Sequence, residues 1–220
     1  MSSKATVMTS KVERERKGFY NSDEQPVPAS ARGSAALEVL STCAIIAAVN
    51  SAEKFAAALN SPTRAIYLLT GTPLTIPEML ARARDHGKVC LVNTDFLDGL
   101  SRDRYAIEFL AAHKVDGVVS TKFEILKVAH SLGLITVQRT FAIDSAAVTA
   151  ALRCLAQFVP DAMEVLPAIA TPKVARRLHN TYPSLRIIGG GLIENVSEIE
   201  GLLAVGVHAV SVSDERLWVI

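Results

Sequence analysis

The feature that most constrains the fold is a regular alternation of short apolar runs with amphipathic stretches, which continues from Leu37 to the end of the chain. Strands of nearly continuous apolar character, each followed by an amphipathic helix, are typical of a parallel sheet covered by helices. The predicted strands are residues 44–49, 65–69, 89–93, 117–121, 134–139, 163–166, 186–188 and 208–212. The predicted helices are residues 51–59, 76–86, 102–113, 124–131, 144–158, 173–180 and 196–204.

The spacing of these units predicts a closed barrel. The polar ends of the last six strands fall near residues 95, 121, 140, 167, 190 and 213, and intervals of roughly two dozen residues fit one strand and one helix each. The alternative is an open, doubly wound sheet, which would carry a glycine-rich fingerprint after its first strand. This chain has Val49-Asn50-Ser51 there. We therefore predict an α/β fold, a compact (β/α)8 TIM-type barrel, over residues 37–220.

Residues 1–36 differ in composition from the rest of the chain. Lys11–Lys17 is a run of mixed charge, and Gln25–Ser34 has the composition of a linker. We predict a disordered N-terminal tail over residues 1–36; an extra helix or a partner-binding arm is the alternative. The segment has no apolar run of the length of a signal peptide core or a membrane span. We expect a cytoplasmic protein without a membrane partner.

Charge and cysteine content narrow the classes of function. The formal net charge is +1, so no bulk positive charge indicates a nucleic-acid partner. Three well-separated cysteines lie in apolar runs, which predicts buried thiols in a reducing compartment. Four histidines, at positions 86, 113, 130 and 179, lie near predicted helix ends, where an imidazolium favours the helix dipole. No metal-binding or nucleophile motif is present, and we predict no metal, no cofactor and no catalytic residue.

The ends of the last two predicted strands suggest a phosphate site. Gly189, Gly190 and Gly191 follow one strand, and Ser211 and Ser213 end the next. Without side chains, glycines let backbone N–H groups approach a ligand closely, and a helix start nearby adds partial positive charge. The loops after strands seven and eight of a (β/α)8 barrel form such a site in many members. A tight turn is the alternative interpretation of the three glycines.

Further polar residues lie where a barrel of this kind places its site, at the carboxyl ends of strands. We predict that Asp95, Lys122, Arg139 and Glu164 bind a polyol. Glu164 lies within an apolar strand, and burying its carboxylate unpaired would cost several kcal/mol. It must therefore meet hydroxyls, a ligand, or a cation such as Arg139 or Lys122. An internal ion pair is the structural alternative for Glu164, and Asp144 is expected to cap a helix.

Six short motifs, taken in order, resemble the glycerol uptake operon antiterminator family. They cover roughly residues 44–218: DFLDGL at 95–100, VDGVVST at 115–121, QRTFAIDS at 138–145, EVLP at 164–167, IGGGLI at 188–193 and ERLW at 215–218. The resemblance implies a (β/α)8-type barrel that senses glycerol-3-phosphate and binds a leader mRNA to prevent transcription termination. It also implies that Gly189–Gly191 and Ser211–Ser213 are the phosphate-binding loops.

The chain departs from the family pattern at three positions around the expected polyol site. Asn50 follows the first strand where the family typically has arginine, Asn93 replaces a histidine, and Ala168 replaces a glycine. For RNA, the local basic clusters of the sequence are Arg82, Arg84 and Lys88 or Arg176 and Arg177. Exposed helix charges are the alternative interpretation of both clusters.

Two functions of different class fit the sequence. The first is a ligand-responsive, mRNA-binding regulator without catalysis, with glycerol-3-phosphate as its effector and with a homo-oligomer left open. The second is a small barrel enzyme that acts on a phosphorylated polyol or triose. It would use Glu164 as general base and Lys122 or Arg139 as electrostatic partner. The lack of an evident acid–base pair favours the regulator, whereas the neutral charge favours the enzyme.

Overall fold

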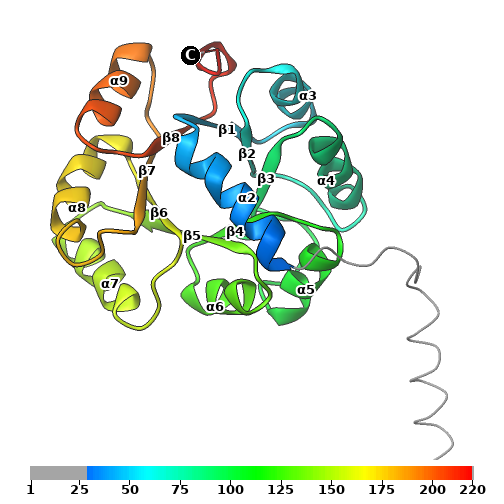
Figure 1. Ribbon diagram of the computed structural model, residues 1–220, viewed down its shortest axis with the longest axis horizontal. Coiled ribbons are helices and arrows are strands. Elements are labelled where there is room, and N and C mark those ends of the chain that lie inside the picture. The colour runs from blue at the N-terminus through cyan, green and yellow to red at the C-terminus, as the bar shows by residue number, and fades with distance from the viewer. Residues whose placement is uncertain (1–28, 220) are drawn as a thin grey trace, which may run out of the picture.

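The computed structural model describes residues 29–219, and Figure 1 shows a ring of strands surrounded by helices. Consecutive strands pair in parallel from first to last, and the last pairs with the first, so the eight strands close into a barrel. The strands are β1 (Ile45–Val49), β2 (Ala65–Leu68), β3 (Val89–Asn93), β4 (Gly117–Ser120), β5 (Ile135–Phe141), β6 (Ala162–Leu166), β7 (Arg186–Gly190) and β8 (Ala209–Val212). The predicted (β/α)8 barrel is confirmed, and the open sheet is wrong.

Helices alternate with these strands on the outside of the barrel (Figure 1). They are α3 (Ala52–Asn60), α4 (Ile76–Asp85), α5 (Arg104–Ala112), α6 (Phe123–Ser131), α7 (Ser145–Leu155), α8 (Thr171–Leu178) and α9 (Val196–Ala204). Two 3-10 helices, η1 (Ala168–Ala170) and η2 (Glu215–Leu217), follow β6 and β8. The predicted elements agree with these bounds to within a few residues; the largest difference is α7, which ends at Leu155 and not near Phe158.

Local chemistry explains where several helices begin. The side chains of Ser51, Asp103, Asp144 and Asn195 each accept a hydrogen bond from the backbone N–H three residues later. Such caps satisfy donors that have no partner inside the helix. The expected role of Asp144 as a cap is thereby confirmed.

The histidines at the helix ends are also where the sequence placed them. His86, His113 and His179 follow the last residues of α4, α5 and α8, and His130 lies in the last turn of α6.

The core forms two main layers because successive side chains of a strand point to opposite faces. On β1 and β2, Ile46, Ala65 and Tyr67 belong to the cluster inside the barrel. Ile66 and Leu68 pack outward with residues from the helices. The thiols of Cys43 and Cys90 are buried as predicted, whereas Cys154 is only half-buried.

The helix α2 (Ala29–Thr42) precedes the barrel and corrects the predicted boundary of the tail. Figure 1 shows it across the barrel end at which the strands begin. Ala36 and Leu40 are buried in the interior cluster with Ile46, and Arg186 donates a hydrogen bond from Nε to Ser41 Oγ. The predicted boundary of the tail is therefore wrong for residues 33–36, which belong to this helix and for which the alternative of an extra helix holds. Residues 1–28, most of the predicted tail, lie outside the described residues.

Candidate functional site

A cavity of about 290 Å³ lies at the carboxyl ends of the strands, the end opposite to α2. Five of the sequence-predicted site residues line it: Arg139, Glu164, Gly191, Ser211 and Ser213. The remaining lining residues are Ala48, Tyr67, Leu69, Leu166, Leu192, Ile193 and Val212. The closed barrel therefore brings together residues that are more than 140 positions apart in the sequence, such as Tyr67 and Ser213.

The centre of the cavity is a buried carboxylate with two partners. Ser211 donates a hydrogen bond from Oγ to Glu164 Oε1 at 2.6 Å, and Arg139 Nε lies 3.3 Å from Glu164 Oε2. Glu164 is only 2% exposed. Burial raises the pKa of Glu164, and the charge of Arg139 and the Ser211 hydrogen bond oppose this only in part. Of the partners expected for Glu164, the structure shows a hydroxyl and Arg139 and not Lys122, and the contact with Arg139 is the internal ion pair named as the structural alternative.

Four buried polar atoms of the lining residues have no hydrogen-bond partner among the described residues. One of them, Arg139 Nε, faces Glu164 Oε2 in the ion pair, and the other three are Tyr67 Oη, Arg139 Nη1 and Glu164 Oε2 itself. Buried polar groups are nearly always hydrogen-bonded, so each such exception calls for an explanation. Burial, reinforced by the nearby Glu164, holds the pKa of the Tyr67 hydroxyl well above its ordinary value, so this group remains a donor. The cavity thus offers two donors and one acceptor to a ligand.

Tyr67 was missed by the sequence analysis. The sequence feature that could have identified it is a tyrosine inside the apolar strand Ala65–Leu69, since a buried tyrosine hydroxyl usually finds a partner. The side chain is 1% exposed and points into the barrel with the interior cluster.

Arg139 also contacts the rim of the cavity. Its guanidinium carbon lies 5.2 Å from the ring centre of Phe96 and 5.7 Å from that of Phe141, distances at which a cation is attracted to the face of a ring. Both rings are 49% exposed. Arg139 therefore joins the buried carboxylate to two exposed aromatic side chains.

The three glycines after β7 have three different surroundings. Only Gly191 lines the cavity, and its φ of +75° is a conformation that favours glycine. A Cβ on Gly190 would lie 2.5 Å from Ser211 Oγ and 2.9 Å from Glu164 Oε1, so this glycine leaves room for the carboxylate and its hydroxyl partner. A Cβ on Gly189 would instead meet Thr171 Oγ1 at 3.2 Å. The structure thus gives Gly189 and Gly190 packing reasons that the sequence analysis did not anticipate.

The two helix starts beside the cavity carry their own acceptors. At α9, the N–H of Glu198 donates to Asn195 Oδ1, and the N–H of Glu194 donates to the Glu198 carboxylate. At η2, the N–H of Arg216 donates to Asp214 Oδ1. These three N–H groups are therefore occupied by side chains of the same segments. A cation lies nearby, because Lys54 Nζ donates to the backbone oxygen of Ser213 at 2.7 Å.

Asp95 and Lys122 do not line the cavity. The carboxylate of Asp95 accepts hydrogen bonds from Ser120 Oγ at 2.9 Å and from the N–H of Thr121 at 2.7 Å, so it links the ends of β3 and β4. Lys122 is exposed at the start of α6.

The three positions at which the chain departs from the family pattern also lie outside the lining. Asn50 is exposed. Asn93 is buried and accepts from the N–H of Asp95, and Ala168 is buried at the start of η1.

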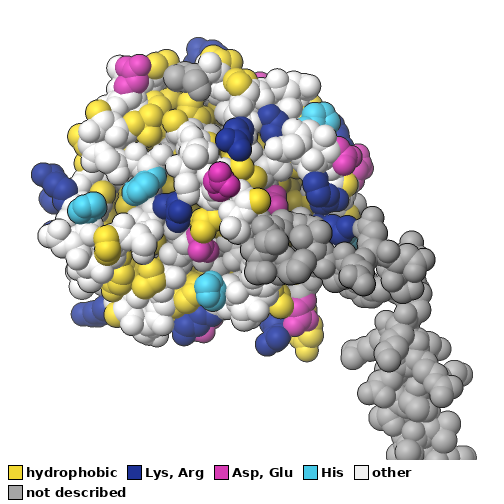
Figure 2. All heavy atoms as spheres, in the orientation of Figure 1, with side chains coloured by type: hydrophobic (Ala, Val, Ile, Leu, Met, Phe, Trp, Pro, Cys, Tyr) yellow, Lys and Arg dark blue, Asp and Glu magenta, His cyan; other side chains and the backbone are white. Residues whose placement is uncertain are grey.

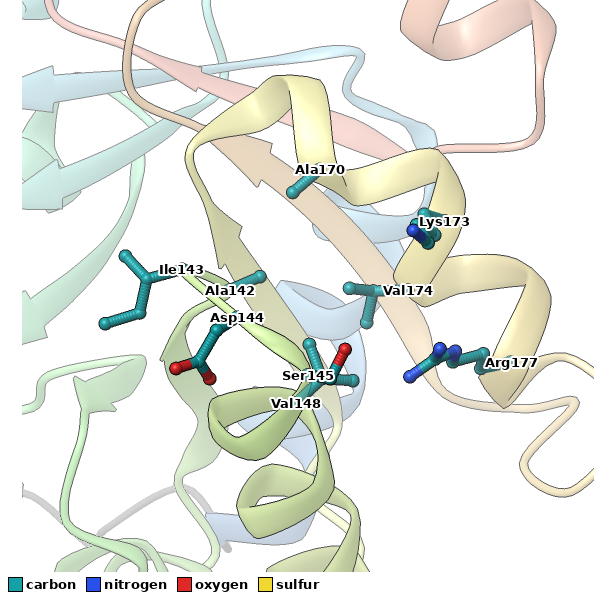
Figure 3. Close-up of a pocket in the computed structure, with 9 residues that line it drawn as sticks. All are labelled: Ala142, Ile143, Asp144, Ser145, Val148, Ala170, Lys173, Val174 and Arg177. Atoms are coloured by element: carbon teal, nitrogen blue, oxygen red, sulfur yellow. The ribbon is translucent and has the colours of Figure 1, made fainter.

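A second cavity, of about 180 Å³, lies beside the first, between the start of α7 and α8 (Figure 3). Ser145 and Val148 of α7 face Ala170 and Val174 across it, with Lys173 on the α8 side. Its other lining residues are Ala142, Ile143, Asp144 and Arg177.

The class of protein that the fold defines is a closed (β/α)8 barrel with a polar cavity at the carboxyl ends of its strands. The sequence comparison adds the family. The family model described as glycerol-3-phosphate responsive antiterminator matches residues 45–218, and the chain belongs to this family. The predicted resemblance is confirmed.

Individual relatives agree with this assignment. The protein YgcP of Escherichia coli (strain K12) is 30% identical over 187 residues, which cover 84% of this chain and 96% of YgcP. Two solved structures are similar. One is a glycerol uptake operon antiterminator-related protein from Thermotoga maritima MSB8, with a TM-score of 0.72, 31% identity, and coverage of 80% of this chain and 98% of that one. The other is a glycerol uptake operon antiterminator regulatory protein from Listeria monocytogenes, with a TM-score of 0.74, 28% identity, and coverage of 81% and 96%.

Among the described residues, no helix has the length and apolar character needed to cross a membrane.

The raised pKa of Glu164 predicts a pH-dependent stability. Below its ordinary pKa of 4.5 the carboxyl is neutral in both the folded and the unfolded protein. As the pH rises above that value, the unfolded chain releases the proton first, so the contribution of Glu164 to stability is lost as the pH passes through the raised folded pKa. The free energy of unfolding of the wild type, relative to that of Glu164→Gln, should therefore fall as pH increases.

Urea unfolding of both proteins between pH 4.5 and pH 8 measures this difference. The glutamine variant does not titrate at position 164, so it corrects for every other ionisable group. If the free energy of unfolding of the wild type relative to Glu164→Gln rose with pH, Arg139 and Ser211 would stabilise the charged carboxylate by more than its burial costs. That result would contradict the raised pKa of Glu164.

Proposed function

We propose that this protein is a regulator that binds glycerol-3-phosphate in the barrel cavity and, in response, binds a leader mRNA to prevent transcription termination. It has no catalytic step in this proposal. Family membership supports the effector and the antitermination role. The names of the Thermotoga and Listeria structures point in the same direction.

The observation that carries the proposal is the set of unpartnered polar atoms in the cavity. The hydroxyls of a glycerol moiety can donate to Glu164 Oε2 and accept from Tyr67 Oη and Arg139 Nη1, three lining atoms that have no hydrogen-bond partner among the described residues. A ligand that supplies these hydrogen bonds removes the cost of leaving the groups unpaired. A polyol, which both donates and accepts at each hydroxyl, suits this arrangement.

We place the phosphate of the effector at Gly191 and Ser213, two further residues of the cavity lining. Gly191 lets the backbone approach a ligand closely, and Lys54 beside Ser213 supplies a positive charge. Because the starts of α9 and η2 are capped by their own side chains, the proposed phosphate contacts are the loop backbone and Lys54. Gly189 and Gly190 contribute to the site through packing, and Ser211 contributes through its hydrogen bond to Glu164.

A barrel enzyme acting on a phosphorylated polyol is the second candidate, and one observation favours it. Glu164 is a buried carboxyl in a cavity with a raised pKa, which is a common property of general bases. Against the enzyme, Glu164 has no evident acid–base partner in the cavity lining. The other two titratable residues there are Tyr67, which keeps its proton, and Arg139, which is paired with Glu164.

Replacing Tyr67 by phenylalanine separates ligand binding from folding. The change removes a buried hydroxyl that has no partner among the described residues, so the free energy of unfolding should stay the same or increase. The affinity for glycerol-3-phosphate should fall about threefold to tenfold, the value of one neutral hydrogen bond. Isothermal calorimetry and urea unfolding measure the two effects.

Tyr182→Phe is the matched control, because Tyr182 is half-buried in the cluster between the outer helices and does not line the cavity. Unchanged affinity of Tyr67→Phe would place the polyol elsewhere.

Linkage between effector and RNA distinguishes the regulator from the enzyme. If effector occupancy tightens RNA binding, RNA must tighten glycerol-3-phosphate binding by the same factor. The affinity for RNA should also fall with added salt, with a slope of about −0.7 per single-strand phosphate contacted. Figure 2 shows basic and acidic side chains interspersed on the face that α2 covers, and the net charge is +1. Few contacts and a shallow slope are therefore expected.

The measurement is a mobility-shift titration on leader RNA with a terminator hairpin, with and without effector, at two salt concentrations. RNA binding that ignores the effector, or no RNA binding at low salt, would exclude the regulator. An assay for turnover of small phosphorylated polyols, with Glu164→Gln as control, would then test the enzyme.

A further inference from the structure

The mouth of the barrel carries exposed apolar side chains. Seven large hydrophobic residues that end or follow strands β2, β3, β5, β6 and β7 are about half or more exposed: Leu74, Phe96, Tyr105, Phe141, Ile143, Ile169 and Leu192. Exposed apolar surface at one end of a molecule commonly marks an interaction site when its side chains gather. The polar ligand cavity lies within this rim, so a macromolecule bound at the rim would lie directly over the effector.

Two of these side chains form a platform suited to flat, aromatic partners. Phe96 and Phe141 both contact the guanidinium of Arg139, which lies between the rim and the buried Glu164. Exposed aromatic rings backed by an arginine are a common surface for stacking the unpaired bases of single-stranded nucleic acid.

The surface that adjoins Phe141 carries two cations. Lys173 and Arg177 line the second cavity (Figure 3), and neither has an ion-pair or hydrogen-bond partner among the described residues. Neither α7 nor α8 contains an aspartate or glutamate, and the one acidic residue of the lining is Asp144, whose carboxylate caps α7 by accepting from the N–H of Ala147. In a chain with a net charge of only +1, this is a local basic surface. It is well placed to contact a phosphate backbone.

Two of the three residues of the other basic cluster considered from the sequence, Arg82 and Lys88, have partners within the fold. Arg82 lies 3.9 Å from Glu78 and over the ring of Phe55. Lys88 Nζ donates to the backbone oxygens of Ser61 and Thr63. The structure therefore favours the α8 cluster.

The platform and the basic surface are physically connected to the ligand cavity. On β5, Arg139 lines the ligand cavity and Phe141, the last residue of the strand, lies on the rim. The next residue, Ala142, lines the second cavity. The N–H of Ala142 donates to the backbone oxygen of Leu166, another residue of the ligand cavity, at 2.7 Å. A ligand that changes the position of Arg139 therefore acts on Phe96, Phe141 and the adjoining loop.

We propose that the rim formed by Phe96 and Phe141, together with Lys173 and Arg177 beside it, is the RNA-binding surface of this protein, with unpaired bases on the rings and phosphates on the two cations. The inference rests on the proposed regulatory function and locates its RNA site. A second copy of the chain fits this surface less well. In a twofold dimer each copy would present the same two cations, and the one carboxylate beside them, Asp144, is already used to cap α7.

The test compares RNA affinities of matched variants by fluorescence anisotropy, with labelled leader RNA that carries a terminator hairpin and its flanking unpaired segments, in the presence of glycerol-3-phosphate. Phe96→Ala/Phe141→Ala should weaken binding at least fivefold, because each stacked base contributes appreciably. Lys173→Ala/Arg177→Ala should make the salt slope shallower by about 1.4, which corresponds to two lost phosphate contacts. This variant should bind glycerol-3-phosphate like the wild type when RNA is absent, since neither cation lines the ligand cavity.

Arg82→Ala/Arg84→Ala is the matched control, because it removes the same charge from α4. Equal losses in this control and in Lys173→Ala/Arg177→Ala would mean a non-specific charge effect and would overturn the inference. If the wild type binds RNA and all variants bind it equally well, the inferred RNA site is wrong but the proposed function stands. No RNA binding by the wild type would remove both. A wild-type dimer that becomes monomeric in Phe96→Ala/Phe141→Ala without loss of RNA affinity, by light scattering, would show that the rim is a protein interface.

Discussion

The interaction on which the site depends is the burial of the Glu164 carboxylate inside the barrel, beside Ser211 and Arg139. A carboxylate without partners at that depth would cost several kcal/mol. Its neighbours therefore have to be arranged around it: a serine on β8, an arginine on β5, and a glycine on β7 whose missing Cβ leaves the space free. Closure of β8 against β1 and β7 is what brings Ser211 to this position.

The same arrangement suggests how a small ligand can control a large partner. Arg139 is shared between the carboxylate in the cavity and the aromatic rings on the rim. A ligand shifts the equilibrium between two arrangements of the rim only as far as it binds one better than the other. In our account, direct contact with Arg139 and Tyr67 supplies that difference. The closed sheet and the helix α2 at the opposite end hold the scaffold fixed, so the change is confined to the mouth.

Much of this could be predicted from the sequence, because hydrophobic periodicity and spacing report directly on strands, helices and their order. They identified the barrel, and the requirement to pair a buried carboxylate identified Arg139 and a hydroxyl as partners of Glu164. Packing between distant segments could not be predicted. Tyr67 belongs to the site only because closure points it at Glu164, Gly190 is explained by the atoms it faces, and Asp95 is occupied by the end of β4. The docking of α2 was hidden because the first part of its sequence, residues 29–36, is linker-like and has no apolar side chain larger than alanine.

A crystal structure of the protein with glycerol-3-phosphate tests the central claim most directly. The account predicts the glycerol hydroxyls within hydrogen-bond distance of Glu164, Arg139 and Tyr67, and the phosphate at the loops of Gly191 and Ser213. Density for the ligand in the second cavity between α7 and α8, with the three buried polar atoms still unpartnered, would contradict it.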